Sequence, residues 1–164
     1  MNRVVNDEAP ARQPAAVARR QWLAILAKAR VEELETAWQA LADKPQYRTL
    51  RRAETGLVMV RGRVGGTGQP FNLGEMTMTR AAVQLLDAAG QVSRTGFGHV
   101  AGRDKRRAEL VALFDAVLQD PEWHDDIAER LIEPLATRQQ AAKAAQAATV
   151  AASKVDFFTM VRGE

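Results

Sequence analysis

The chain has 164 residues, a length typical of one domain with a single hydrophobic core. Its formal charge is only +3 although its isoelectric point is about 9.7, so it can contact phosphates but lacks the clustered basic stripes of a nucleic-acid-binding protein. Cysteine is absent and only two histidines are present, which excludes disulfides, a cysteine nucleophile and thiolate metal sites and leaves too few histidines for a metal site of its own.

The beginning of the chain differs in composition from the remainder. Residues 1–14 mix charge, proline and alanine without an apolar core, as expected for a disordered leader and not for a signal peptide. No apolar run approaches the roughly 20 residues needed to cross a bilayer, so we expect a cytoplasmic protein. Residues 15–136 are predicted to form an α+β domain. Residues 137–164 are predicted to form an alanine-rich helix and an apolar C-terminal segment that contacts a partner.

Two helices are predicted at the start of the domain, with a break near Arg30; one long helix is the alternative. Apolar residues recur at helical spacing on both sides of this break, with Trp22 in the first helix and Trp38 in the second. Glu32 and Glu33 suit the first turn of the second helix. The tryptophan faces either bind a partner or belong to the core, and the core is favoured because the domain is small.

A small antiparallel sheet of three or four strands is predicted in the middle of the chain, packed with helices. Residues 47–52 have the pattern of a short edge strand. Two strand-like runs, residues 57–64 and 71–86, flank a glycine-rich loop and predict a β-hairpin. A turn at residues 87–90 then leads to a returning strand at residues 96–100.

This hairpin carries the candidate phosphate-binding residues. Alternation places Arg61 and Arg63 on one face of the first strand and valines on the other. Because glycine reaches positive φ at low cost, backbone N–H groups of the loop can approach an anion. The candidate loop ligands are Gly65, Gly66, Thr67 and Gly68. The alternative is a tight turn with solvated arginines, and the glycine spacing matches neither the dinucleotide nor the P-loop motif.

Three further residues are candidates for chemistry. Glu75 could act as a general base or bind a cation, but a salt bridge to Arg61 or Arg63 across the hairpin is the commoner arrangement. His99 is a weak candidate acid–base group because imidazole titrates near neutral pH. Arg103 could bind phosphate at a helix N-terminus or be solvated. No set of nucleophile, base and orienting group can be assembled from these residues.

The second half of the chain is predicted to be helical. Asp104 is a suitable N-cap for a clear helix that ends at Asp120, and a shorter helix follows and is expected to stop near Pro134. Residues 137–153 are so rich in alanine that their helix has little side-chain volume to bury.

The last residues turn apolar again. The candidate partner-binding residues of this tail are Phe157, Phe158 and Met160. Terminal segments fray unless they are tied down. The tail is therefore expected either to add an edge strand to its own sheet or to bind a partner.

Several separated motifs follow one another along the chain. They are the glycine hairpin at residues 56–68, Phe71-Asn72-Leu73-Gly74-Glu75, Thr79-Arg80-Ala81-Ala82-Val83, Gly102-Arg103-Asp104 and residues 155–163. Together, and in this order, they resemble the PhnG family, the G subunit of the bacterial carbon–phosphorus lyase core complex. The similarity covers nearly everything after Arg20.

The resemblance implies a role in phosphonate catabolism. PhnG-like proteins act with the PhnH, PhnI and PhnL subunits to displace adenine from MgATP with a phosphonate, giving α-D-ribose 1-phosphonate 5-triphosphate. PhnJ later cleaves the carbon–phosphorus bond. The resemblance therefore predicts an assembly subunit of a transferase, inactive alone, that binds no cofactor by itself and works on MgATP within the complex. The alternatives are a hairpin that supplies catalytic or triphosphate-binding groups directly and a free-standing phosphate- or RNA-binding module.

Overall fold

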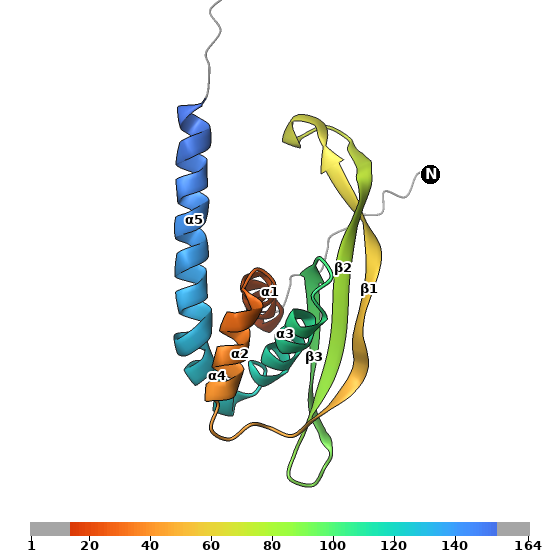
Figure 1. Ribbon diagram of the computed structural model, residues 1–164, viewed down its shortest axis with the longest axis vertical. Coiled ribbons are helices and arrows are strands. Elements are labelled where there is room, and N and C mark those ends of the chain that lie inside the picture. Colours follow the sequence, from red (N-terminus) through yellow and green to blue (C-terminus); the bar gives the residue numbers. More distant parts are fainter. Residues whose placement is uncertain (1–13, 154–164) are drawn as a thin grey trace, which may run out of the picture.

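The computed structural model describes residues 14–153 as an α+β domain in which helices cover one face of a three-stranded antiparallel sheet (Figure 1). The predicted fold class is confirmed. The elements in chain order are α1 (Pro14–Leu26), α2 (Val31–Ala40), β1 (Tyr47–Arg63), the 3-10 turn η1 (Val64–Gly66), β2 (Pro70–Leu86), β3 (Val92–Ala101), α3 (Lys105–Val117), α4 (Pro121–Ile127), the π-helical turn η2 (Ala128–Ile132) and α5 (Glu133–Ala152).

Helix α3 is the centre of the domain. It lies between the sheet on one side and the other helices on the other (Figure 1), so from Leu110 to its end it is buried on all sides and not along one stripe. Its apolar residues were predicted to face the core, and they do. The buried residues of α3 are Ala108, Leu110, Val111, Ala112, Leu113, Phe114, Asp115, Ala116 and Val117. The helix begins at the predicted N-cap, Asp104, whose side chain accepts from the Arg107 N–H at 2.9 Å.

Two glycines allow α3 to lie directly against β3. A Cβ atom at Gly96 would stand 2.0 Å from the carbonyl oxygen of Ala112, and one at Gly98 would stand 1.9 Å from that of Ala108. Distances this short cannot be accommodated without moving the helix, because the opposing atoms are backbone. The strand and the helix therefore touch backbone to backbone, which requires glycine at both positions.

A buried carboxylate joins three elements at this contact. Asp115 of α3 is fully buried and binds Arg19 of α1 through two hydrogen bonds, from Nε at 3.0 Å and from Nη2 at 2.6 Å. The Trp22 indole N–H donates to the same carboxylate at 3.0 Å, and the backbone N–H of Phe97 in β3 donates at 2.8 Å. Four donors satisfy the charge, as a buried ionised group requires.

The expected break between the first two helices is present, and both tryptophans belong to the core, as predicted. Trp38 is buried and meets the Phe114 ring edge-on, with centroids 5.8 Å apart. Trp22 packs against the same core in addition to binding Asp115. Residues 1–13, and with them most of the predicted leader, lie outside the described residues.

Two predictions about element boundaries are wrong. Residues 47–52 are not a separate strand but the start of the 17-residue β1, because register shifts between Thr49 and Glu54 absorb the irregular spacing without ending the pairing with β2. The helical chain does not stop near Pro134 either. Pro134 lies in the first turn of α5, where proline is tolerated, directly after the π-helical turn. No helix within residues 14–153 combines the length and the apolar character needed to span a membrane.

The strand–helix contact predicts a large effect for Gly98→Ala. The added methyl group collides with the Ala108 carbonyl, so α3 must shift. The free energy of unfolding should therefore fall by about 1–3 kcal/mol, as for other overpacked positions. Urea unfolding followed by circular dichroism measures this change. Gly56→Ala is the matched control, since nothing lies within 4 Å of a Cβ atom there. Equal stability of the two variants would contradict the close contact.

Candidate functional site

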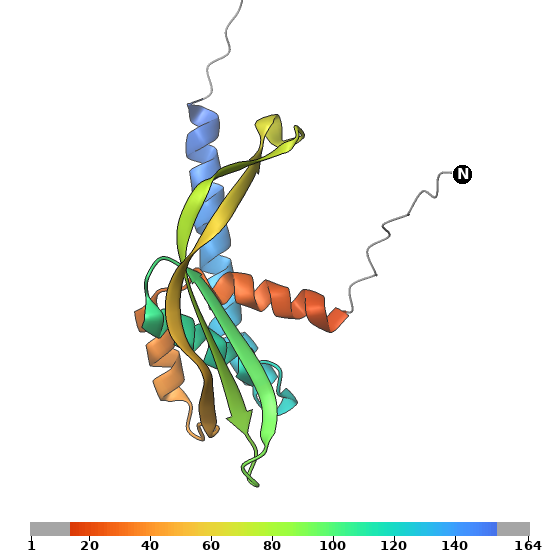
Figure 2. The ribbon, with the colours of Figure 1, turned by 90° about the vertical axis from the view of Figure 1, so that its right-hand side faces the viewer.

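The first feature of the candidate site is a two-stranded ribbon that extends beyond the domain. Pairing between β2 and β3 ends at Met78, whereas β1 and β2 remain paired to Arg63 and Pro70. We call residues 56–77, which include the connecting loop, the ribbon. Eight residues at about 3.4 Å each carry its strands roughly 27 Å past the end of β3. Figure 2 shows the ribbon rising past helices α1 to α4 in the direction taken by α5.

The loop at the tip is a closed turn. Gly65 and Gly66 have φ of 60° and 80°, the conformation for which glycine was predicted there. The N–H groups of Thr67 and Gly68 both donate to the carbonyl of Val64. The Arg63 guanidinium donates to the Gly68 carbonyl at 3.1 Å. These two amides hold the turn itself together, so the geometry matches the tight-turn alternative better than an open anion cradle.

The arginines of the ribbon are not paired with Glu75. Register places Arg61 opposite Asn72 and Arg63 opposite Pro70, while Glu75 lies opposite Met59. Within residues 14–153 no ion pair joins Glu75 to either arginine. The salt bridge expected between Glu75 and Arg61 or Arg63 is therefore absent from the described residues. A register shift after Val60 displaces the two strands by one residue, so that neither arginine is paired with Glu75.

The two weak catalytic candidates are far apart. His99 lies beside Arg80 in the paired strands, and Arg80 lies on the opposite face of β2 from Glu75 by alternation. Five residues separate Arg80 from Glu75 along the strand, which is about 17 Å. The structure therefore does not bring Glu75 and His99 together.

His99 instead borders a shallow hollow on the open face of the sheet, with a volume of about 370 Å³. Glu54 is its charged centre and accepts from Arg80 Nε and from Arg51 Nη1, both at 2.8 Å. The Arg51 hydrogen bond, followed by that of Arg80, lowers the pKa of Glu54. Sequence reasoning missed Glu54 because its partner Arg80 lies 26 residues away and is reached only through the hairpin register.

Arg103, the remaining phosphate candidate, is exposed in the loop before α3 and lies at the end of β3, away from the ribbon tip. The loop candidates and Arg103 are therefore not brought into one site. Among residues 14–153 no group of three histidine, aspartate or glutamate side chains is placed to hold a metal ion. Phe157, Phe158 and Met160 lie outside the described residues.

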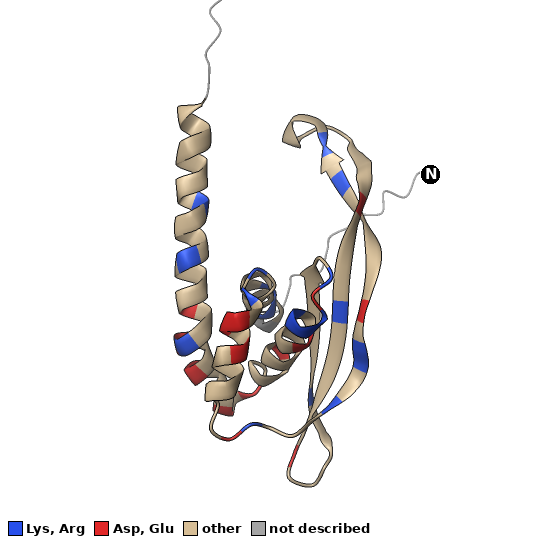
Figure 3. Ribbon diagram, in the orientation of Figure 1, with Lys and Arg blue, Asp and Glu red and all other residues tan. Residues whose placement is uncertain are grey.

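The second projecting element is α5. Its first turns are fixed to the domain by buried Leu135, by an ion pair between Arg138 and Glu33, and by a hydrogen bond from Gln139 Nε2 to the Ile25 carbonyl at 2.9 Å. All residues from 140 to 153 are exposed. Residues 144–152, the last part of this helix, include no charged residue, whereas Figure 3 shows acidic residues on the helices near its base.

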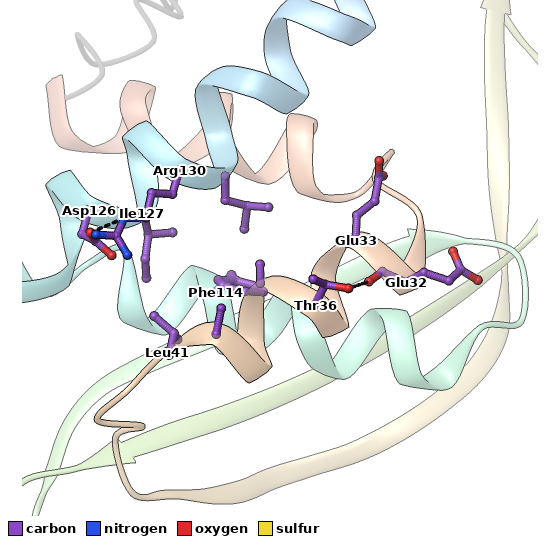
Figure 4. A pocket seen from close by; sticks show the side chains of 11 residues that line it. Glu32, Glu33, Thr36, Leu41, Phe114, Asp126, Ile127 and Arg130 are labelled. Carbon is purple, nitrogen blue, oxygen red and sulfur yellow. Dashed lines mark hydrogen bonds and ion pairs between the residues drawn. The ribbon is translucent and has the colours of Figure 1, made fainter.

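A groove of about 430 Å³ lies at that base, between α2 and the α4–η2 segment (Figure 4). Its walls include Leu41, Phe114 and Ile127, and its two ends are charged, with Glu33 at one and the Asp126–Arg130 pair at the other. The Arg30 guanidinium, which donates to the Glu33 carboxylate at 3.0 Å, lowers the pKa of Glu33 to about 2.

Fold and site together define a class of protein: a small α+β domain with a projecting hairpin and a projecting helix, in which the candidate catalytic residues within residues 14–153 are not assembled into one site. Residues 17–163 match the family described as "Phosphonate metabolism protein PhnG". A protein of Rhizobium meliloti (strain 1021), "Alpha-D-ribose 1-methylphosphonate 5-triphosphate synthase subunit PhnG", is 48% identical over 159 residues, which cover 96% of this chain and 98% of that protein. The chain belongs to the PhnG family, as its motifs predicted.

The ion pairs at the base of α5 predict a pH-dependent contribution to stability. Because the folded-state pKa of Glu33 is lowered from 4.5 to about 2, its contribution is fully present above about pH 4.5 and is lost as the pH falls toward 2. Glu33→Gln should therefore lower the free energy of unfolding at pH 7 by on the order of 1 kcal/mol. The difference from wild type should shrink between pH 4.5 and pH 2.

Urea unfolding at a series of pH values measures this effect. Glu32→Gln serves as the control, because no ion pair of Glu32 occurs within residues 14–153. A difference between Glu33→Gln and wild type that stays constant down to pH 2 would contradict the assignment.

Proposed function

We propose that this protein is a subunit of an α-D-ribose 1-methylphosphonate 5-triphosphate synthase. It acts with PhnH, PhnI and PhnL in the transfer of the ribose triphosphate moiety of MgATP to a phosphonate, with release of adenine. PhnJ belongs to the same core complex and cleaves the carbon–phosphorus bond afterwards. Membership of the PhnG family and 48% identity to a protein named as a subunit of this synthase support the proposal. A reaction that consumes MgATP is consistent with the cytoplasm.

The role of the chain within the complex is mainly assembly. The observation that carries this proposal is the ribbon, whose exposed apolar side chains extend past the domain's own core. Monomeric proteins rarely expose large apolar patches, and those that do usually bind other molecules through them. The distance between Glu75 and His99 is further support. These two residues are the catalytic candidates that the sequence offers, and they cannot act together in one site. The tail residues Phe157, Phe158 and Met160 are proposed as an additional partner-binding segment.

Omission of single subunits tests the assembly role. The purified chain should release no adenine from MgATP and phosphonate, and the full mixture of subunits should. Omitting this chain should reduce adenine release by at least an order of magnitude and prevent the remaining subunits from co-purifying as one complex. Adenine release by the isolated chain at a rate near that of the complex would overturn the assembly role, and full activity without the chain would overturn the subunit assignment.

Direct contact with triphosphate is the second candidate function, favoured by the two arginines on one face of β1. One guanidinium group can donate two hydrogen bonds to the oxygens of a phosphate. Alternate residues of a strand stand about 7 Å apart, so a triphosphate is long enough to contact both arginines. Against it, the loop amides of Thr67 and Gly68 are already used within the turn.

The double variant Arg61→Gln, Arg63→Gln separates these functions. If the arginines serve assembly, the complex should weaken while the KM for MgATP of the complex that remains is unchanged. If they bind triphosphate, the complex should form normally and the KM should rise at least tenfold, given on the order of 1.5–3 kcal/mol for each charged hydrogen bond lost. Sedimentation velocity and adenine-release kinetics measure the two quantities. Arg52→Gln, an exposed β1 arginine outside the ribbon, is the control.

A further inference from the structure

We propose that the ribbon, residues 56–77, is an insertion arm that enters an apolar cleft with an acidic rim in a different subunit of the complex. This inference rests on the proposed function and specifies the surface and the chemistry of the partner. Among residues 14–153 the ribbon joins the domain only at its base, since beyond Met78 no third strand of this range pairs with it.

Apolar side chains project from both faces of the ribbon. Leu57 and Met59, which are 64% and 49% exposed, lie on the face that also carries Arg61 and Glu75. Val58 and Val60 alternate onto the other face and are half-buried. A ribbon that merely lay on a protein surface would cover the apolar side chains of only one face, so covering those of both faces requires a cleft.

The second face is extended by side chains of β2. Met76 pairs with Val58 and is exposed. Leu73 lies over Gly62, where an added Cβ atom would stand 2.7 Å from Leu73 Cδ1. Gly62 thus leaves room for the Leu73 side chain, which is nevertheless 63% exposed. An apolar face built in this way and covered by no other part of residues 14–153 is suited to a partner.

Exposed apolar side chains are concentrated in the ribbon. Of the twelve large apolar residues exposed within the described residues, six belong to it; they are Leu57, Met59, Val64, Phe71, Leu73 and Met76. An isolated two-stranded hairpin is only marginally stable in water. Enclosure by a partner would remove this apolar area from solvent and stabilise the ribbon at the same time.

The charges of the ribbon define the rim of the cleft. Arg61 forms no ion pair within residues 14–153, and Arg63 donates only to a backbone carbonyl of the loop. Glu54, at the base, is already neutralised by Arg51 and Arg80 of the same chain. The partner must therefore supply carboxylates opposite the arginines. Two copies of this chain joined ribbon to ribbon would bring four arginines against only two carboxylates, those of Glu75, and leave an excess of positive charge, so the partner is a different polypeptide.

Thiol labelling tests the insertion directly. The chain has no cysteine, so Met59→Cys and Met76→Cys each place a unique thiol in this subunit, on opposite faces of the ribbon. Val92→Cys is the matched control, because Val92 is 42% exposed at the end of the sheet remote from the ribbon. Maleimide labelling of this subunit is followed by mass spectrometry, for the free chain and for the complex reconstituted with the other synthase subunits.

Both ribbon thiols should react as fast as the control in the free chain and at least about tenfold more slowly in the complex, while the control keeps its rate. Unchanged labelling of both ribbon thiols in an active complex would overturn the insertion arm and leave the subunit assignment intact. Protection of one face alone would also overturn it, because a cleft covers both. Failure of the wild-type chain to join the complex, or full synthase activity without it, would instead contradict the proposed function.

A binding measurement tests the apolar contact. Leu57→Asp should raise the Kd for the remaining subunits by about 30-fold or more, the loss typical of a buried central interface residue. Val92→Asp should leave the Kd within about threefold of wild type. Thermal unfolding of each free variant reports its fold. An unchanged Kd for a folded Leu57→Asp chain would overturn the proposal.

Discussion

The contact between α3 and β3 is the constraint on which the rest of the structure depends. With glycine at positions 96 and 98, the helix lies against the strand without intervening side chains. This proximity is what lets the carboxylate of Asp115 accept from the Phe97 amide of the strand while also binding α1. A larger residue at either glycine would move the helix away from the strand. The Asp115 carboxylate would then no longer reach the Phe97 amide.

The same contact determines where the core ends. Strand β3 stops at Ala101 and α3 starts at Lys105, so the helix covers only the part of the sheet that has three strands. Beyond Met78 β1 and β2 continue, and no helix or third strand among residues 14–153 lies against them. The domain is thus compact around α3 and open at the ribbon, and stability and partner binding are carried by different parts of one sheet.

The sequence predicted well the features that depend on neighbouring residues. The hairpin, its glycine turn and the N-cap Asp104 result from local alternation, conformational freedom and spacing. The network of Asp115 could not be found this way, because its partner Arg19 is 96 residues away and a carboxylate in a helix is normally assigned to the surface. The exposure of Leu57 was missed for a related reason: alternation shows that two residues share a face, but not whether another element covers that face.

Arg19 and Asp115 are separated by 96 residues. Helix α1 is therefore synthesised long before Asp115, the residue that anchors it. At translation rates of roughly 5–20 residues per second the delay is about 5–20 s. During that time the guanidinium of Arg19 and the indole of Trp22 have no buried acceptor, and the hairpin has no α3 to cover its base. Closure of the domain is therefore a late event in synthesis, and the nascent chain displays apolar strands to chaperones until α3 has emerged.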